Sequence, residues 1–115
     1  MSFDRGTIVY ADDPFRDDDS GRPWVIINTA EMPFHGDQYI ALALTTKTWY
    51  DERLPIDEDD LIDGGLPKTS VILPWAVGAI GPNEIDRELG TLADTVVDAA
   101  VTDLISYLGA DYDES

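Results

Sequence analysis

Cysteine is absent from this 115-residue chain, and histidine occurs once, as His35. Without thiols the chain forms no disulfides and no thiolate metal sites, and a single imidazole argues against a zinc site. No apolar run approaches the roughly 20 residues that a membrane-spanning helix needs. We therefore expect a protein without metal or other cofactor and without a membrane span, which depends on a packed core for its stability.

The length fits one domain, and we predict a single domain over residues 1–115. A chain of this size can bury roughly two-thirds of the surface that its unfolded form exposes. The first residues show no basic segment followed by an apolar one, as a secretory signal would. The expected location is therefore the cytoplasm.

Acidic residues dominate the charge, with 24 Asp and Glu against 7 Lys and Arg, a net charge of −17. In ordinary cytoplasm such a field repels nucleic acids and other anions. Most of the acids are aspartates and only two residues are lysines, a composition that indicates a cytoplasm rich in salt. At ~1 M salt the Debye length is about 3 Å, so distant carboxylates are screened while a direct phosphate contact is not.

The acidity has two other interpretations. An acidic disordered chain is disfavoured, because 43% of the residues are hydrophobic and no low-complexity segment occurs. A nucleic-acid mimic remains an alternative. The salt interpretation removes charge as an argument against RNA binding.

Short segments with β-type sequence recur along most of the chain. Residues 24–28 form a continuous apolar run, as expected of a strand covered on both faces, with Trp24 most simply in the core. Pro74 marks a bulge or bend between two predicted strands. The remaining strands are predicted at residues 7–11, 39–44, 54–56, 70–73, 76–80 and 90–92. Short strands separated by turn signals predict a small barrel.

An amphipathic helix is predicted at about residues 94–108, with Asp94 as its N-cap and Gly109 as its C-terminal stop. One apolar stripe recurs at helical spacing and consists of Val97, Ala100, Val101, Leu104, Ile105 and Leu108. The opposite face carries acids and no basic residue. We therefore expect this helix to pack on the barrel and to make no contact with RNA.

Three segments place a guanidinium and two hydroxyls at the ends of apolar strands. Residues 5–10 read RGTIVY, residues 21–27 read GRPWVII, and residues 42–47 read LALTTK. Their order resembles the MazF/PemK family of toxin endoribonucleases, over roughly residues 5–108. Each motif alone is common, so the specificity comes from the three in order, followed by residues 70–73 and the C-terminal helix.

The resemblance implies a mainly β (α+β) fold, a small SH3-like curved β-barrel at about residues 5–92 with the C-terminal helix packed across it. It also implies the toxin of a toxin–antitoxin pair, a metal-independent endoribonuclease that cleaves single-stranded mRNA by 2′-hydroxyl transesterification. The implied partners are single-stranded RNA, a cognate antitoxin segment in the groove, and a second copy in a homodimer.

The resemblance makes Arg22 and Thr45 the catalytic candidates. Arg22 offers a planar fork to phosphate oxygens, and the alternative is an arginine that pairs with the acidic loop at residues 17–19. Thr45 matches the family threonine that hydrogen-bonds the scissile phosphate, although β-branched residues also suit a strand end. Arg5, by contrast, is expected to anchor the first strand.

Further RNA contacts are predicted at Thr46, Lys47, Arg53 and Trp75. Lys47 adds a cation near the strand end, or is a solvated surface lysine. An exposed indole at position 75 could stack on an unpaired base, whereas a core or dimer-interface tryptophan is the commoner case.

One departure from the family pattern separates two functions. After the strand at residues 70–73 the family carries an acid, a glutamine and, two residues further, a basic residue, where this chain has Trp75, Ala76 and Gly78. Either Arg22 and the threonines carry the chemistry alone, or Arg53 or His35 substitutes. The alternative function is a catalytically impaired barrel that binds RNA or an antitoxin-like peptide.

Overall fold

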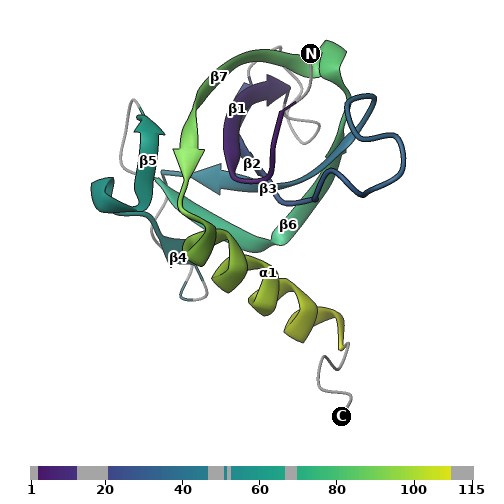
Figure 1. Cartoon of the computed structure of the whole chain (residues 1–115). Coiled ribbons are helices and arrows are strands. Elements are labelled where there is room, and N and C mark those ends of the chain that lie inside the picture. The colour runs from purple at the N-terminus through teal and green to yellow at the C-terminus, as the bar shows by residue number, and fades with distance from the viewer. Residues whose placement is uncertain (1–2, 13–20, 47–50, 52, 67–69, 110–115) are drawn as a thin grey trace.

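The computed structural model describes residues 3–12, 21–46, 51, 53–66 and 70–109, and the following statements concern these residues. They form one seven-stranded antiparallel sheet, two short 3₁₀ helices and one α-helix (Figure 1). In chain order the elements are β1 (Thr7–Asp12), β2 (Gly21–Ile26), β3 (Tyr39–Thr45), β4 (Leu54–Pro55), η1 (Glu58–Asp60), β5 (Leu61–Gly64), β6 (Val71–Ile80), η2 (Pro82–Glu84), β7 (Ile85–Leu92) and α1 (Asp94–Leu108).

The sheet curls because its two outer strands are close neighbours in sequence. The strand order is β4-β6-β3-β2-β1-β7-β5, yet only residues 56–60 separate β4 from β5. So short a link holds both edges of the sheet close together, and the long strands β6 and β7 bend around the others (Figure 1). This is the mainly β curved architecture with a C-terminal helix that the sequence predicted.

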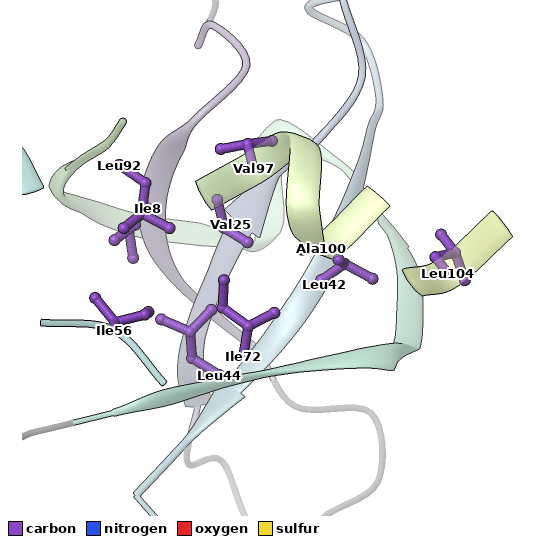
Figure 2. Packing of buried hydrophobic residues seen from close by; sticks show 10 residues of the cluster. All are labelled: Ile8, Val25, Leu42, Leu44, Ile56, Ile72, Leu92, Val97, Ala100 and Leu104. Atoms are coloured by element: carbon purple, nitrogen blue, oxygen red, sulfur yellow. The ribbon is translucent and has the colours of Figure 1, made fainter. Parts of the chain in front are cut away.

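Both faces of the central strands are buried. One face packs against α1 through a cluster that includes Ile8, Val25, Leu42, Leu44, Ile72, Val97 and Ala100 (Figure 2). The other face holds a second cluster, which includes Val9, Ala11, Trp24, Ile26, Tyr39, Ala41, Ala43 and Ile80. The continuous apolar run in β2 is therefore explained by burial of its alternate side chains on opposite faces, as predicted.

Helix α1 covers the predicted residues and differs from the prediction at its start and in its last turn. Its N-cap is Ala93 instead of Asp94, whereas Gly109 ends it as predicted, in the left-handed conformation with a φ of 80°. Val97, Ala100 and Leu104 are buried (Figure 2). Leu108 is 70% exposed, because the last turns of the helix extend beyond the sheet (Figure 1). No helix in the described part of the chain is long and apolar enough to cross a membrane.

Three strand predictions need correction. Strand β2 begins at Gly21, so Arg22 lies inside the strand and does not precede it. Strand β5 was missed, since its four residues form a polar sheet edge with little apolar alternation. The segments on either side of Pro74 belong to one strand, β6, which pairs with β3 on both sides of a register shift. Proline is tolerated there because a bulge needs no ladder hydrogen bond from it.

Arg5 links the N-terminal residues of the chain to the first turns of helix α1. Its Nε donates to the carbonyl oxygen of Ile27 at 3.1 Å, and its Nη2 donates to Asp98 Oδ1 at 2.7 Å. The second carboxylate, that of Asp94, lies 3.9 Å from Nη1. The expected anchoring role of Arg5 is confirmed, and the acidic face of α1 provides its partner.

Replacing Arg5 with alanine should lower the free energy of unfolding by about 1–2 kcal/mol. The change removes a hydrogen bond to a backbone carbonyl and a charge-assisted bond to an exposed carboxylate, each of modest value. Chemical denaturation in molar potassium chloride measures the loss. Arg87→Ala is the control, since the pairing of Arg87 with Asp86 and its contact with the Tyr10 ring stay within the adjacent strands β7 and β1 and do not reach the helix. An equal loss in both variants would contradict the anchoring role.

Candidate phosphate-binding site

Arg22 is held in β2 by the close approach of β1. It lies opposite Ala11, and Gly21 lies opposite Asp12. A Cβ atom at position 21 would lie 2.4 Å from the carbonyl oxygen of Ala11, so only glycine permits this approach. Gly21 thus allows the strand to begin one residue before Arg22, and the guanidinium projects from an ordered sheet.

The register between β2 and β3 brings Arg22 to Thr45. Trp24 pairs with Ala43 and Val25 with Leu42 in an antiparallel ladder. Continuing this register by two residues places Arg22 opposite Thr45. Directly opposite residues share one face, with Cβ atoms about 4.5–5.5 Å apart. The observed pairing of β2 with β3 ends at Trp24 and Ala43, and the two catalytic candidates lie just beyond it on the same face of the sheet.

Thr45 is also held by the strand on the other side of β3, because it pairs with Val71 of β6. The preceding Leu44 points to the opposite face and is fully buried in the helix-side cluster. Thr46 follows the end of β3 and is exposed. Lys47 lies outside the described residues, as does the acidic loop at 17–19.

Arg53 lies at the far side of the same face. Pro55 pairs with Val71, the residue opposite Thr45, and Leu54 pairs with Ile72. The same register places Arg53 opposite Leu73, on the face that carries Thr45. Strands β2 and β4 are three strand spacings apart, roughly 14 Å. Among the described residues, Arg22 and Arg53 are the arginines on this face.

The other described arginines are engaged elsewhere. Arg5 binds the helix, and Arg87 lies over the Tyr10 ring at 4.5 Å and beside Asp86. Arg87 and Tyr10 are paired residues on the opposite face from Arg22. Arg5 and Arg87 thus do not belong to the sheet face that carries Arg22 and Thr45.

Trp75 does not share this face. It follows the orientation of Val77, which is paired with the helix-side residue Leu42, and its ring meets Tyr107 of α1 edge to face at 6.4 Å. Trp75 therefore lies outside the candidate site, and the predicted stacking of its ring on an RNA base bound at Arg22 is not supported by its position.

His35 is also distant from the site. It lies in the connection between β2 and β3, at the opposite end of these strands from Arg22. Its Nδ1 lies 3.1 Å from Asn28 Nδ2, and its ring packs edge to face on Tyr39. The histidine is half-buried and contacts Asn28 and Tyr39 within this connection, so it is not a substitute catalyst at Arg22.

The missing polar side chains have a steric explanation. Gly78 lies opposite Ala41 on the Trp24 face, and an added Cβ would lie 3.2 and 3.3 Å from the far edge of the Trp24 indole. Ala76 packs against the same apolar cluster. Trp24 is 1% exposed, as predicted for a core residue, and its Nε1 has no hydrogen-bond partner among the described residues. An indole therefore fills the volume beside position 78.

A cavity of about 460 Å³ lies beyond β4, next to the Arg22–Thr45 face but outside it. Its lining includes Asp57, Glu58 and the polar Ser70, together with apolar residues of the 56–66 segment. Two carboxylates make it unfavourable for a phosphate. The Arg22–Thr45 face therefore remains the candidate site for a phosphate.

Comparisons with known proteins identify the family and the fold. Residues 4–108 match the family described as the PemK-like, MazF-like toxin of type II toxin–antitoxin systems. The chain belongs to this toxin family. No match was found among curated proteins.

Solved structures share the fold of this MazF-like chain. An endoribonuclease from a mycobacterial species, in complex with its cognate antitoxin, is 20% identical, with a TM-score of 0.73, covering 97% of this chain and 98% of that one. The MazE–MazF structure from Deinococcus radiodurans (Form-III) is 16% identical, with a TM-score of 0.77, covering 96% and 100%. At this identity the likeness concerns the fold.

Steric exclusion at position 78 can be tested by a double-mutant cycle. Gly78→Arg alone should lower stability by about 1–3 kcal/mol, because the side chain meets the Trp24 ring in a packed cluster. In the Trp24→Ala background the same substitution should cost less, which gives a favourable coupling energy. Urea denaturation of the four proteins measures it. Additive losses would show that the indole does not occupy this volume.

Proposed function

We propose that this chain is a metal-independent endoribonuclease that cleaves single-stranded mRNA in the cytoplasm, at the face formed by Arg22 and Thr45. The observation that supports the proposal is the β2–β3 register, which makes a guanidinium and a hydroxyl neighbours at one end of two strands. A planar fork and a hydroxyl donor together can bind the non-bridging oxygens of a phosphodiester.

The proposed reaction is a transesterification. The 2′ hydroxyl loses its proton to solvent as its oxygen attacks the adjacent phosphorus and forms a P–O2′ bond. The P–O5′ bond breaks and the leaving 5′ oxygen takes a proton from solvent, which leaves a cyclic phosphate and a free 5′ hydroxyl. Negative charge grows on the non-bridging oxygens as the phosphorane forms. Arg22 stabilises this charge, and Thr45 orients the phosphate. Arg53, roughly 14 Å away, binds another phosphate further along the same RNA strand and fixes the direction of the strand.

A binding module without catalysis is the second candidate. It is favoured by the packing of Trp24 over Gly78 and by the apolar Ala76, since the family carries polar groups at these two positions. In this function the same Arg22–Thr45 face holds RNA or an antitoxin-like peptide uncut. Cleavage with chelator present separates the two candidates.

Two protein partners belong to the proposal. A cognate antitoxin segment occupies the Arg22–Thr45 face and excludes RNA, and two copies of the chain form a homodimer. The fold neighbours include an endoribonuclease in complex with its cognate antitoxin and MazE–MazF structures, which supports the first partner.

Arg22→Ala should lower the rate of RNA cleavage by about 10²–10³-fold, as the loss of one donor to a developing oxyanion typically does. Arg22→Lys should recover part of the binding but little of the rate, because an ammonium lacks the bidentate fork. Fragments of a long single-stranded RNA are followed over time in molar potassium chloride with chelator.

The matched control is Arg87→Ala, which also removes one guanidinium but from the opposite face. It should leave cleavage unchanged. Undiminished cleavage by Arg22→Ala would remove Arg22 from the mechanism. Intact RNA that remains bound to the wild-type protein would instead support the binding module.

Salt should act on this protein in the opposite direction to that seen with most RNA-binding proteins. Binding normally weakens as salt rises, because counterion release contributes less. Here the net charge of −17 repels RNA until screening shortens its range to about 3 Å near 1 M salt. RNA affinity, measured by fluorescence anisotropy, should therefore rise from low to molar potassium chloride.

The fold itself should also depend on salt. Circular dichroism should show loss of structure at low salt, and a fold indifferent to salt would contradict adaptation to a salt-rich cytoplasm.

A further inference from the structure

The cavity beyond β4 lies where the two outer strands of the sheet come close together. Its lining residues belong to the link between β4 and β5, to β5 and the two residues that follow it, and to the residue before β6. Its volume of about 460 Å³ is typical of pockets that bind small molecules. A single planar ring system fits such a volume, and the groups of the lining decide which one.

Apolar residues and glycines form most of the lining. Ile56 is 6% exposed and belongs to the helix-side cluster, and the half-buried Leu61 and Leu66 pack against that cluster. Gly64 and Gly65 complete this part of the lining without a side chain. Apolar walls with few polar groups between them suit the two faces of a planar ring.

Two carboxylates are the charged groups of the lining, those of Asp57 and Glu58. The backbone that carries them is held by two hydrogen bonds. The Asp57 N–H donates to Asp60 Oδ2 at 2.9 Å, and the Ala93 N–H donates to the Asp60 carbonyl oxygen at 2.8 Å. The short helix η1 is thereby attached to the residue before α1. No basic residue occurs among the described residues of the lining, so the carboxylates give the cavity its polar character.

The chemistry of a carboxylate selects the ligand. An ionised carboxylate only accepts hydrogen bonds, so it requires donors and repels a phosphate. Unpaired RNA bases expose their Watson–Crick edges, and on that edge guanine carries two adjacent donors, N1–H and the N2 amino group. Adenine and cytosine carry one amino group beside an acceptor nitrogen, and uracil carries one N–H between two carbonyls. Guanine is therefore the base whose edge matches the two oxygens of a carboxylate.

The position of the cavity connects it to the proposed path of the RNA. Arg53, the proposed second phosphate contact, directly precedes β4, and the lining starts at Ile56, directly after β4. RNA that crosses the sheet from Arg22 to Arg53 therefore continues at the cavity. At ~1 M salt the Debye length is about 3 Å, so the acids of the cavity do not repel phosphates that lie further away.

We propose that this cavity binds one guanine base of single-stranded RNA through the carboxylates of Asp57 and Glu58. The inference rests on the proposed function, and it applies to a protein that cleaves RNA and to one that only binds it. A base bound next to the Arg53 phosphate contact fixes which part of the RNA lies at Arg22 and Thr45. Asp57 and Glu58 are then specificity-determining residues.

The first test varies the base and uses the wild-type protein. Labelled 2′-deoxy oligothymidylates lack the attacking hydroxyl, so they bind without cleavage, and each carries one central guanine, hypoxanthine, adenine or cytosine. Their affinities are compared by fluorescence anisotropy in molar potassium chloride. The guanine oligonucleotide should bind about 10-fold or more tightly than those with adenine or cytosine, as a bidentate base contact typically provides. Hypoxanthine lacks only the N2 amino group and should give an intermediate affinity.

The second test varies the carboxylates. Asp57→Asn and Glu58→Gln each replace an acceptor oxygen with a donor amide, and each should reduce the preference for guanine. The double variant should abolish that preference while it still binds the unsubstituted oligothymidylate. Asp59→Asn is the matched control, because Asp59 is an exposed acid of the same short helix that does not line the cavity. It should keep the full preference.

The outcomes separate this inference from the proposed function. Equal affinity for all bases, or a guanine preference that survives the double variant, would overturn the guanine site and leave RNA binding in place. Guanine-dependent binding of RNA that is never cut would exclude the enzyme and leave the guanine site standing. Absence of binding to every oligonucleotide would contradict both. The comparison of guanine with hypoxanthine needs no variant, so it decides the question even if a variant fails to fold by circular dichroism.

Discussion

The antiparallel register of β2 against β3 is the constraint on which the site depends. Trp24 opposite Ala43 fixes which side chains share a face, and it places Arg22 with Thr45. A slip of one residue would send Arg22 into the helix-side core and Trp24 away from its cluster. The register is enforced by burial on both faces, since β2 alternates between two separate apolar clusters. Arg22 therefore owes its position to the packing of its apolar neighbours.

Most strands and the helix could be predicted, because their sequence signals are local. The apolar run after Arg22 and the helical repeat ending at Gly109 each correspond to one element. Family-like spacing added the order of the motifs. The register of β2 on β3 was beyond prediction, because it depends on contacts between distant residues, and so was the short polar strand β5, which is held by its pairing with β7.

The faces of individual side chains were harder to predict than the strands themselves. Trp75 follows a bulged region of β6, where simple alternation from Pro74 cannot be counted, and it turns toward Tyr107. The sequence indicates that Gly78 stands where the family carries a basic functional residue. In the structure the Trp24 ring packs against this glycine. A ring from one strand filling space beside another is a tertiary relation that no local sequence signal contains.

The pairing of β1 with β7 and the bond between Arg5 and Asp98 join the first residues of the chain to the last element. During synthesis β1 leaves the ribosome long before β7 and α1 do. Until then, the edge of β1 that pairs with β7 and its side chains that face the helix remain exposed to solvent. Such long sequence separation between contacting residues slows folding and makes it depend on the complete chain. A nascent chain that stops before residue 94 lacks the helix residues that complete this core cluster, so the fold that presents Arg22 requires α1 to be synthesised first.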